Sequence, residues 1–169
     1  QEQTLHLLDS VDYAANAGVV PAIACMGEKD VFFEAHVIMG QAMSREGLTM
    51  VNLISPGTGH VIDPQTHAEQ MRRIGEYARS GLNRAPKTLR FVTWSLKYSR
   101  CHWLRLLKLE RHYDRSEFVA RLDEQGVLQI EEPVNIVRFA IDPPMLTAQQ
   151  SRVKVGGQEL ALPPRRNAA

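Results

Sequence analysis

The first half of the chain alternates between short apolar runs and longer stretches in which apolar residues recur every three or four positions. The apolar runs are Val19 to Met26 and Leu48 to Ile54, and uninterrupted runs of this length are typical of strands buried on both faces of a parallel sheet. The periodic stretches follow each run and have the spacing of amphipathic helices. The predicted order in this half is strand, helix, strand, helix.

Helix-capping and helix-terminating residues set the ends of the two predicted helices. The first runs from Glu34 to Glu46, and Gly47 is a natural left-handed stop. The second has Asp63 as N-cap and Pro64 at its first position, and ends before Gly81. The apolar stripes are Ala35, Ile38, Met39, Ala42 and Met43 in the first helix and Ala68, Met71, Ile74 and Ala78 in the second.

From Thr88 onward the pattern changes to alternation with period two, which predicts antiparallel β structure. The predicted faces are Val92, Trp94, Leu96 and Tyr98, then Phe118, Ala120 and Leu122, then Val137, Phe139 and Ile141. The Leu-rich stretch from Cys101 to His112 suits a helix by composition, but its place between strands favours a strand. Val153 to Leu162 is predicted to form a hairpin through Gly156 and Gly157.

The predicted fold class is therefore α/β followed by all-β. The expected organisation is an α/β portion over 1–82, a linker over 83–87, a β-rich accessory domain over 88–162 and a disordered tail over 163–169. Charge supports the division, because residues 1–82 hold 5 Lys and Arg against 10 Asp and Glu, whereas residues 83–169 hold 15 against 9.

Composition excludes several classes of function. No apolar run approaches the roughly 20 residues of a membrane span, so no membrane partner is expected. The Lys and Arg residues of the second half alternate with apolar ones instead of clustering, which favours a solvated sheet face over a nucleic-acid footprint. The start at Gln1 leaves the natural N-terminus and any targeting signal open, with secretion or a periplasmic location as candidates for the full-length protein.

Candidate chemistry lies just after each predicted strand of the first half. Asp30 follows the first strand and His60 follows the second in a glycine-rich loop, so both should meet at the carboxyl edge of a parallel sheet. An acid that orients a histidine is the base system of serine hydrolases. If so, a carboxylate oxygen should lie roughly 2.6–3.2 Å from one imidazole nitrogen. The blander alternative is a helix-capping Asp30 and a solvated His60.

The motifs add a family resemblance. VPAIACMGEKD and LTMVNLISPGTGHVIDPQTHAEQMRRIGEYA resemble the last two strand-helix units of prolyl-oligopeptidase-like α/β-hydrolases. In that family strand-GE-x-D carries the acid and PG-x-GH the histidine, which implies that Asp30 and His60 are catalytic. The second half is similar to the β-rich segment that follows the hydrolase domain in a group of large bacterial proteins of this type, on Thr93 to Tyr98, Trp103 and His112-Tyr113.

The departure from this family is the absence of a Gly-x-Ser-x-Gly nucleophile elbow. Ser55 precedes a proline and Ser80 ends a helix, so neither has the required setting. The resemblance therefore implies a C-terminal fragment of a serine hydrolase, a peptidase or esterase, which is inactive alone. Its substrate in the full-length protein would be a small ester or peptide. A half-domain also exposes an apolar sheet edge, which predicts self-association or dependence on the missing N-terminal part.

The remaining candidate residues are expected to have no catalytic or metal-binding role. His36 and His67 are expected to be solvated or capping, since zinc needs three or four convergent ligands, and Cys25 and Cys101 to be structural. No cofactor or metal is expected. His102 and His112 lie beside aromatic residues that could bind a sugar or peptide. The alternative function is accordingly a non-catalytic scaffold with a β module for carbohydrate binding or oligomer contacts.

Overall fold

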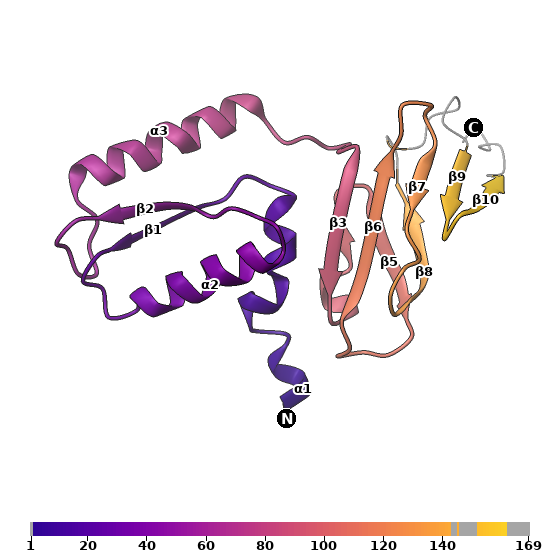
Figure 1. Cartoon of the computed structure of the whole chain (residues 1–169), viewed down its shortest axis with the longest axis horizontal. Helices are drawn as coiled ribbons and strands as arrows, with labels where there is room; N and C mark the ends of the chain where they lie inside the picture. The colour runs from indigo at the N-terminus through magenta and orange to yellow at the C-terminus, as the bar shows by residue number, and fades with distance from the viewer. Residues whose placement is uncertain (1, 143–144, 146–151, 162–169) are drawn as a thin grey trace, which may run out of the picture. The chain divides into compact units, whose positions relative to one another are not determined.

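A computed structural model describes residues 2–142, 145 and 152–161 of the chain. The chain divides into two compact units (Figure 1). One contains residues 9–82, and we call it the α/β unit; the other joins residues 1–8 to residues 83–169, and we call it the β unit. The expected tail over 163–169 lies outside the described residues.

The α/β unit has the predicted alternation of strands and helices. Its strands pair in parallel, from Ile23 with Val51 to Gly27 with Ser55. Figure 1 shows the two longer helices on opposite faces of this small sheet. The elements are the 3-10 helix η1 (Ser10–Gly18), β1 (Ile23–Gly27), α2 (Phe33–Arg45), β2 (Val51–Ser55) and α3 (Pro64–Ser80).

The predicted helix ends are confirmed. Gly47 follows α2 with φ of 75° and Gly81 follows α3 with φ of 69°, left-handed conformations that glycine adopts without a Cβ penalty. Asp63 caps α3 by accepting hydrogen bonds from the amides of Gln65 and Thr66. Local sequence therefore sets the ends of both helices and the start of α3, whereas α2 begins at Phe33 without a side-chain cap.

Burial in the α/β unit is lower than the apolar runs predict. β1 begins at Ile23 and not at Val19, because Pro21 lacks an amide donor, and only Gly27 of β1 is fully buried. No residue of α3 is buried, so the stripe expected there is half exposed at Met71 and Ile74. The prediction of strands buried on both faces is wrong for this chain. A sheet of two strands is too narrow to bury both of its own faces and the inner faces of both helices.

The β unit contains two sheets among its described residues. One has the order β10-β9-β7-β6-β3 and the other β4-β5-β8. All pairs are antiparallel except β7 with β9, which is parallel. The elements are α1 (Glu2–Leu5), β3 (Thr88–Thr93), η2 (Leu96–Tyr98), β4 (Arg100–Cys101), β5 (Leu104–Leu109), β6 (Ser116–Leu122), β7 (Leu128–Ile130), β8 (Ile136–Ile141), β9 (Arg152–Val155) and β10 (Gln158–Ala161).

Aromatic side chains join the two sheets into one core. Phe118 on β6 is fully buried and meets Phe139 on β8 edge to face, with ring centroids 5.0 Å apart. Its other neighbour is Trp103, at 6.3 Å, whose indole donates to the carbonyl of Pro86. Edge-to-face pairs of this kind add about 0.5–1.5 kcal/mol beyond burial. The β unit thus has a core of its own.

Several predictions for the β unit need correction. β3 ends at Thr93, and Leu96–Tyr98 forms a 3-10 helix because the Ser95 side chain accepts from the amide of Lys97 and turns the chain. The buried face of β3 is consequently Leu89, Phe91 and Thr93, with Val92 also buried, and not the predicted one. Val137 on β8 is exposed. The stretch from Cys101 to His112, predicted as one strand, is β structure only in part: β4 and β5 pair antiparallel around a turn at His102, and β5 ends at Leu109. The hairpin through Gly156 and Gly157 is confirmed.

Residues 1–8 group with the β unit and not with residues 9–82, contrary to the domain boundaries expected from the sequence. The His6 ring stacks on Trp94, with centroids 3.9 Å apart and planes at 7°. The Tyr98 hydroxyl donates to the carbonyl of Leu7 at 3.2 Å. Neither contact has a sequence signal. No helix of the described residues is long and apolar enough to cross a membrane.

Candidate active site

Asp30 is fixed by the turn that follows β1. Its amide donates to the carbonyl of Gly27 at 3.1 Å, and its carbonyl accepts from the amide of Phe33 at the start of α2. Its Oδ1 accepts from the amide of Phe32 at 2.9 Å. Only 5% of the side chain is exposed. One carboxylate oxygen is thereby held by backbone, and the other is left to face the neighbouring loop.

That second oxygen meets His60. Oδ2 of Asp30 lies 2.8 Å from Nδ1 of His60, within the range expected for an orienting pair. The imidazole is 83% exposed, and its Nε2 has no hydrogen-bond partner among the described residues. The predicted geometry of Asp30 and His60 is therefore confirmed: a buried acid holds one nitrogen, and the other faces solvent.

The two loops that carry the pair are joined by backbone contacts. Glu28 and Lys29 donate their amides to the carbonyls of Ser55 and Thr58, at 2.9 and 2.8 Å. The Glu28 carboxylate accepts from the amide of Gly57 at 2.7 Å. Gly57 has φ of 67°, so the sharp bend expected of this loop is made there. These bonds prolong the pairing of β1 and β2 beyond the strands.

The closest approach of the loops is at Gly27. A Cβ atom on this residue would lie 2.0 Å from the carbonyl oxygen of Gly59 and 2.7 Å from that of Thr58. Atoms that are not bonded to each other do not approach this closely, so only glycine fits at this position. Sequence reasoning singled out the glycines of the histidine loop and missed Gly27, although the glycine at the end of an apolar run was the available signal.

Electrostatics keep Asp30 ionised. The hydrogen bond from the Phe32 amide lowers the pKa of its carboxyl below the ordinary value, partial desolvation opposes this, and the His60 contact lowers it further. An ionised acceptor at 2.8 Å requires Nδ1 to carry a proton, which in a neutral ring leaves the lone pair on Nε2. The arrangement therefore presents a proton-accepting nitrogen to solvent.

Exposed apolar side chains lie next to the pair in the sequence. Phe32 and His60 meet edge to face, with ring centroids 6.0 Å apart and planes at 72°. Phe32 is 61% exposed, and Val31 and Val61 are exposed as well. Sequence reasoning did not identify these three residues, although each lies directly beside or near a candidate catalytic residue in the chain.

Cys25, Cys101 and Ser55 are unsuited to act as a nucleophile for this histidine. The pKa of the Cys25 thiol is raised by burial and by Asp63, and burial raises that of Cys101 to about 11. Both thiols are therefore protonated at neutral pH and unsuited to attack. Ser55 is buried and bonded to Asp63, which removes it as a candidate.

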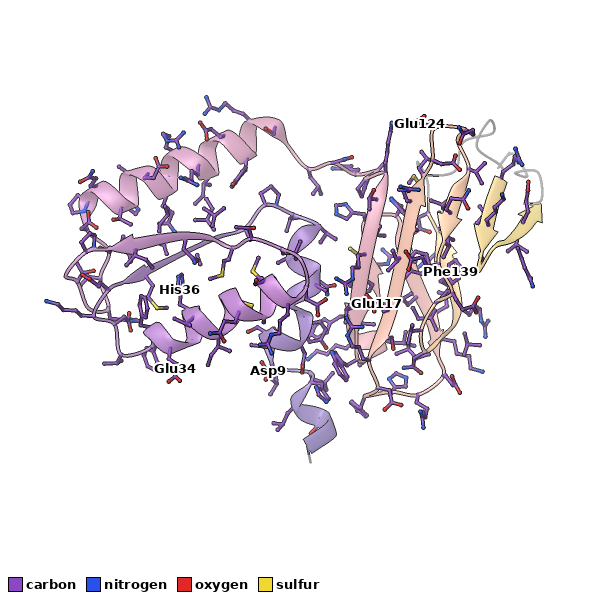
Figure 2. The ribbon with its side chains drawn as sticks, in the orientation of Figure 1. Asp9, Glu34, His36, Glu117, Glu124 and Phe139 are labelled. Carbon is purple, nitrogen blue, oxygen red and sulfur yellow. The ribbon has the colours of Figure 1, made fainter. Side chains whose placement is uncertain are left out.

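The other histidines lie apart from this pair. His36 is 7% exposed, and the prediction that it is solvated is wrong; Figure 2 shows it between α2 and the two strands, on the buried face with Ala42 and Met43. His67 is exposed on α3. His102 and His112 belong to the β unit, where the His112 ring lies 6.2 Å from Tyr113. No three His, Cys, Asp or Glu side chains within the described ranges could hold a metal ion.

Comparisons of this chain with protein-family models, with curated proteins and with solved structures found no match. Its function is therefore inferred from geometry and motifs.

A pH dependence of stability follows from the carboxylates of this region. The pKa values of Asp30 and Asp63 lie below their ordinary values, whereas an unfolded aspartate titrates at about 3.9. The stability that they contribute is complete above that pH and is lost as pH falls through the folded-state values. We expect the melting temperature to fall below roughly pH 5. Asp63→Asn should flatten this dependence in thermal unfolding followed by circular dichroism; an unchanged dependence would contradict the assignment.

Proposed function

We propose that this chain supplies the acid and the base of a serine hydrolase, a peptidase or esterase that works through an acyl-enzyme. The observation that supports it best is the 2.8 Å contact between buried Asp30 and the exposed ring of His60. The motifs around both residues, which resemble those of prolyl-oligopeptidase-like α/β-hydrolases, support the same assignment. On this proposal the α/β unit is the last part of a hydrolase sheet.

The chemistry assigns one role to each residue. Nε2 of His60 accepts the proton of a serine hydroxyl as that oxygen attacks an ester or amide carbonyl, and then gives it to the leaving group. Asp30 holds the ring in the tautomer with its proton on Nδ1 and stabilises the imidazolium that forms. In the second half of the cycle His60 removes a proton from water, which attacks the acyl group and releases the serine. The serine and the oxyanion donors would come from residues outside this chain.

A covalent probe tests the proposal directly. A fluorophosphonate should label a longer form of the protein that includes the sequence upstream of Gln1, and it should leave the 169-residue chain unlabelled. His60→Ala in the longer form should remove labelling, whereas His67→Ala, an exposed histidine on α3, should retain it. Labelling that is absent from the longer form, or that persists in His60→Ala, would overturn the proposal in favour of a scaffold with a β module.

The isolated chain should also self-associate or depend on a missing N-terminal part. β1 and β2 pair only with each other among the described strands, so each has an unpaired outer edge, and such edges readily pair with other chains. Light scattering coupled to size exclusion should show a mass that rises with concentration above 19.0 kDa. A stable, folded monomer at high concentration would contradict this expectation.

A further inference from the structure

A pair of side chains closes the base of the loop that carries His60. The hydroxyl of Ser55, at the end of β2, donates to Oδ2 of Asp63 at 2.6 Å, and the amide of Asp63 donates back to that hydroxyl oxygen at 2.7 Å. Ser55 is 0% exposed. We call this reciprocal pair the clasp. It joins Ser55, the last residue before the loop, to Asp63, the first residue after it.

The same aspartate begins α3. While Oδ2 engages Ser55, Oδ1 accepts from the amides of Gln65 and Thr66 at 2.9 and 3.0 Å. Both oxygens of Asp63 are thus in use. The hydrogen bond from Ser55 has the largest effect on the pKa of this carboxyl, followed by those from Thr66, and together they hold it well below its usual range. The acceptor is therefore ionised at any pH at which a hydrolase would work. Charge-assisted bonds of this kind are about twice as strong as neutral ones.

The position of His60 depends on its loop more than on its own packing. Its ring is 83% exposed, and Asp30 is its one polar partner in the part of the chain that the structure describes. At its front the loop is fixed by Glu28, whose carboxylate accepts from Gly57. At its rear, beyond His60, the clasp is the contact that returns the chain to the end of β2.

We infer that Ser55 and Asp63 are positioning residues for His60, which hold the histidine loop closed so that Nδ1 stays on Asp30. The inference deepens the proposed function and rests on it for its catalytic meaning. The geometric part concerns this chain alone and can be tested without turnover.

The test uses NMR of the 169-residue chain with labelled histidine. The Nδ1 proton of His60 should give a downfield signal protected by Asp30. Ser55→Ala removes the clasp but leaves Asp63 free to cap α3, and should speed exchange of this proton with water by about tenfold or more, the factor that one charge-assisted hydrogen bond represents. Asp63→Ser is the second variant: it keeps a good N-cap but its side chain is too short to reach Oγ of Ser55. It removes the side-chain bond of the clasp, leaves the backbone amide bond, and should speed exchange in the same direction.

Ala78→Gly is the matched control. Ala78 is exposed on α3, far along the helix from Asp63, so glycine there weakens the helix through its low helix propensity without touching the loop. Its Nδ1 signal should match the unaltered chain. Wild-type exchange in either clasp variant, or equal acceleration in Ala78→Gly, would overturn the inference and leave the proposed function standing. If the clasp variants behave as expected but the fluorophosphonate does not label the longer form, the proposed function would be overturned and the inference about the clasp would stand.

Discussion

On the proposed function, replacing His60 with alanine should abolish turnover in a longer form of the protein, because His60 is the proposed acceptor of the nucleophile's proton. Asp30→Asn should lower kcat by about four orders of magnitude, on the scale that loss of the orienting carboxylate has in Ser-His-Asp triads. The neutral side-chain amide that replaces the carboxylate cannot stabilise an imidazolium, and it can hold the His60 ring in the wrong tautomer. KM should change little, since Asp30 is 5% exposed and beyond the reach of substrate.

Ester hydrolysis by the purified variants measures this effect. His67→Ala is the control for loss of an imidazole, because His67 is exposed on α3 and has no place in the pair. Retention of a tenth or more of the wild-type kcat by Asp30→Asn would show that Asp30 is a capping residue, as its bond to the Phe32 amide alone would allow. The Asp30 and His60 contact would then be structural.

Where local sequence determines structure, prediction succeeded. Glycine and the Asp-Pro pair set the ends of α2 and α3, and parallel pairing of two apolar strands placed Asp30 and His60 at one edge. The motif order and the glycine-rich loop were therefore enough to find the pair. The catalytic role proposed for the pair rests on this geometry together with the motifs around both residues.

Where structure depends on neighbours distant in the sequence, prediction failed. The apolar runs predicted full burial, but β1 and α3 are partly exposed because no further strands cover them here. His36 was expected to be solvated or capping and is buried, since packing decides which face of α2 meets the strands. The clasp of Ser55 and Asp63 joins residues eight apart through a loop conformation that no periodicity encodes.

The second large effect should come from one methyl group at Gly27. In Gly27→Ala the new Cβ would lie 2.0 Å from the carbonyl oxygen of Gly59, 2.7 Å from that of Thr58 and 2.8 Å from the Thr58 hydroxyl. Two of these three atoms are backbone, so no rotamer change relieves the clash, and the histidine loop must move away from β1. We expect destabilisation of about 1–3 kcal/mol, the usual cost of overpacking, together with loss of the protected Nδ1 signal of His60.

Gly75→Ala is the matched change, because it also adds one methyl group to a glycine of the α/β unit. Gly75 lies inside α3, and a Cβ there would meet nothing within 4 Å, so alanine should stabilise the chain by roughly 0.5–1 kcal/mol through its higher helix propensity. Thermal unfolding and histidine NMR of the two variants should move in opposite directions, with the Nδ1 signal kept only in Gly75→Ala. If Gly27→Ala kept both the stability and the signal, the close approach at Gly27 would not be what brings His60 onto Asp30. The pair would then be held by the clasp and by the hydrogen bonds of Glu28 and Lys29 to the histidine loop.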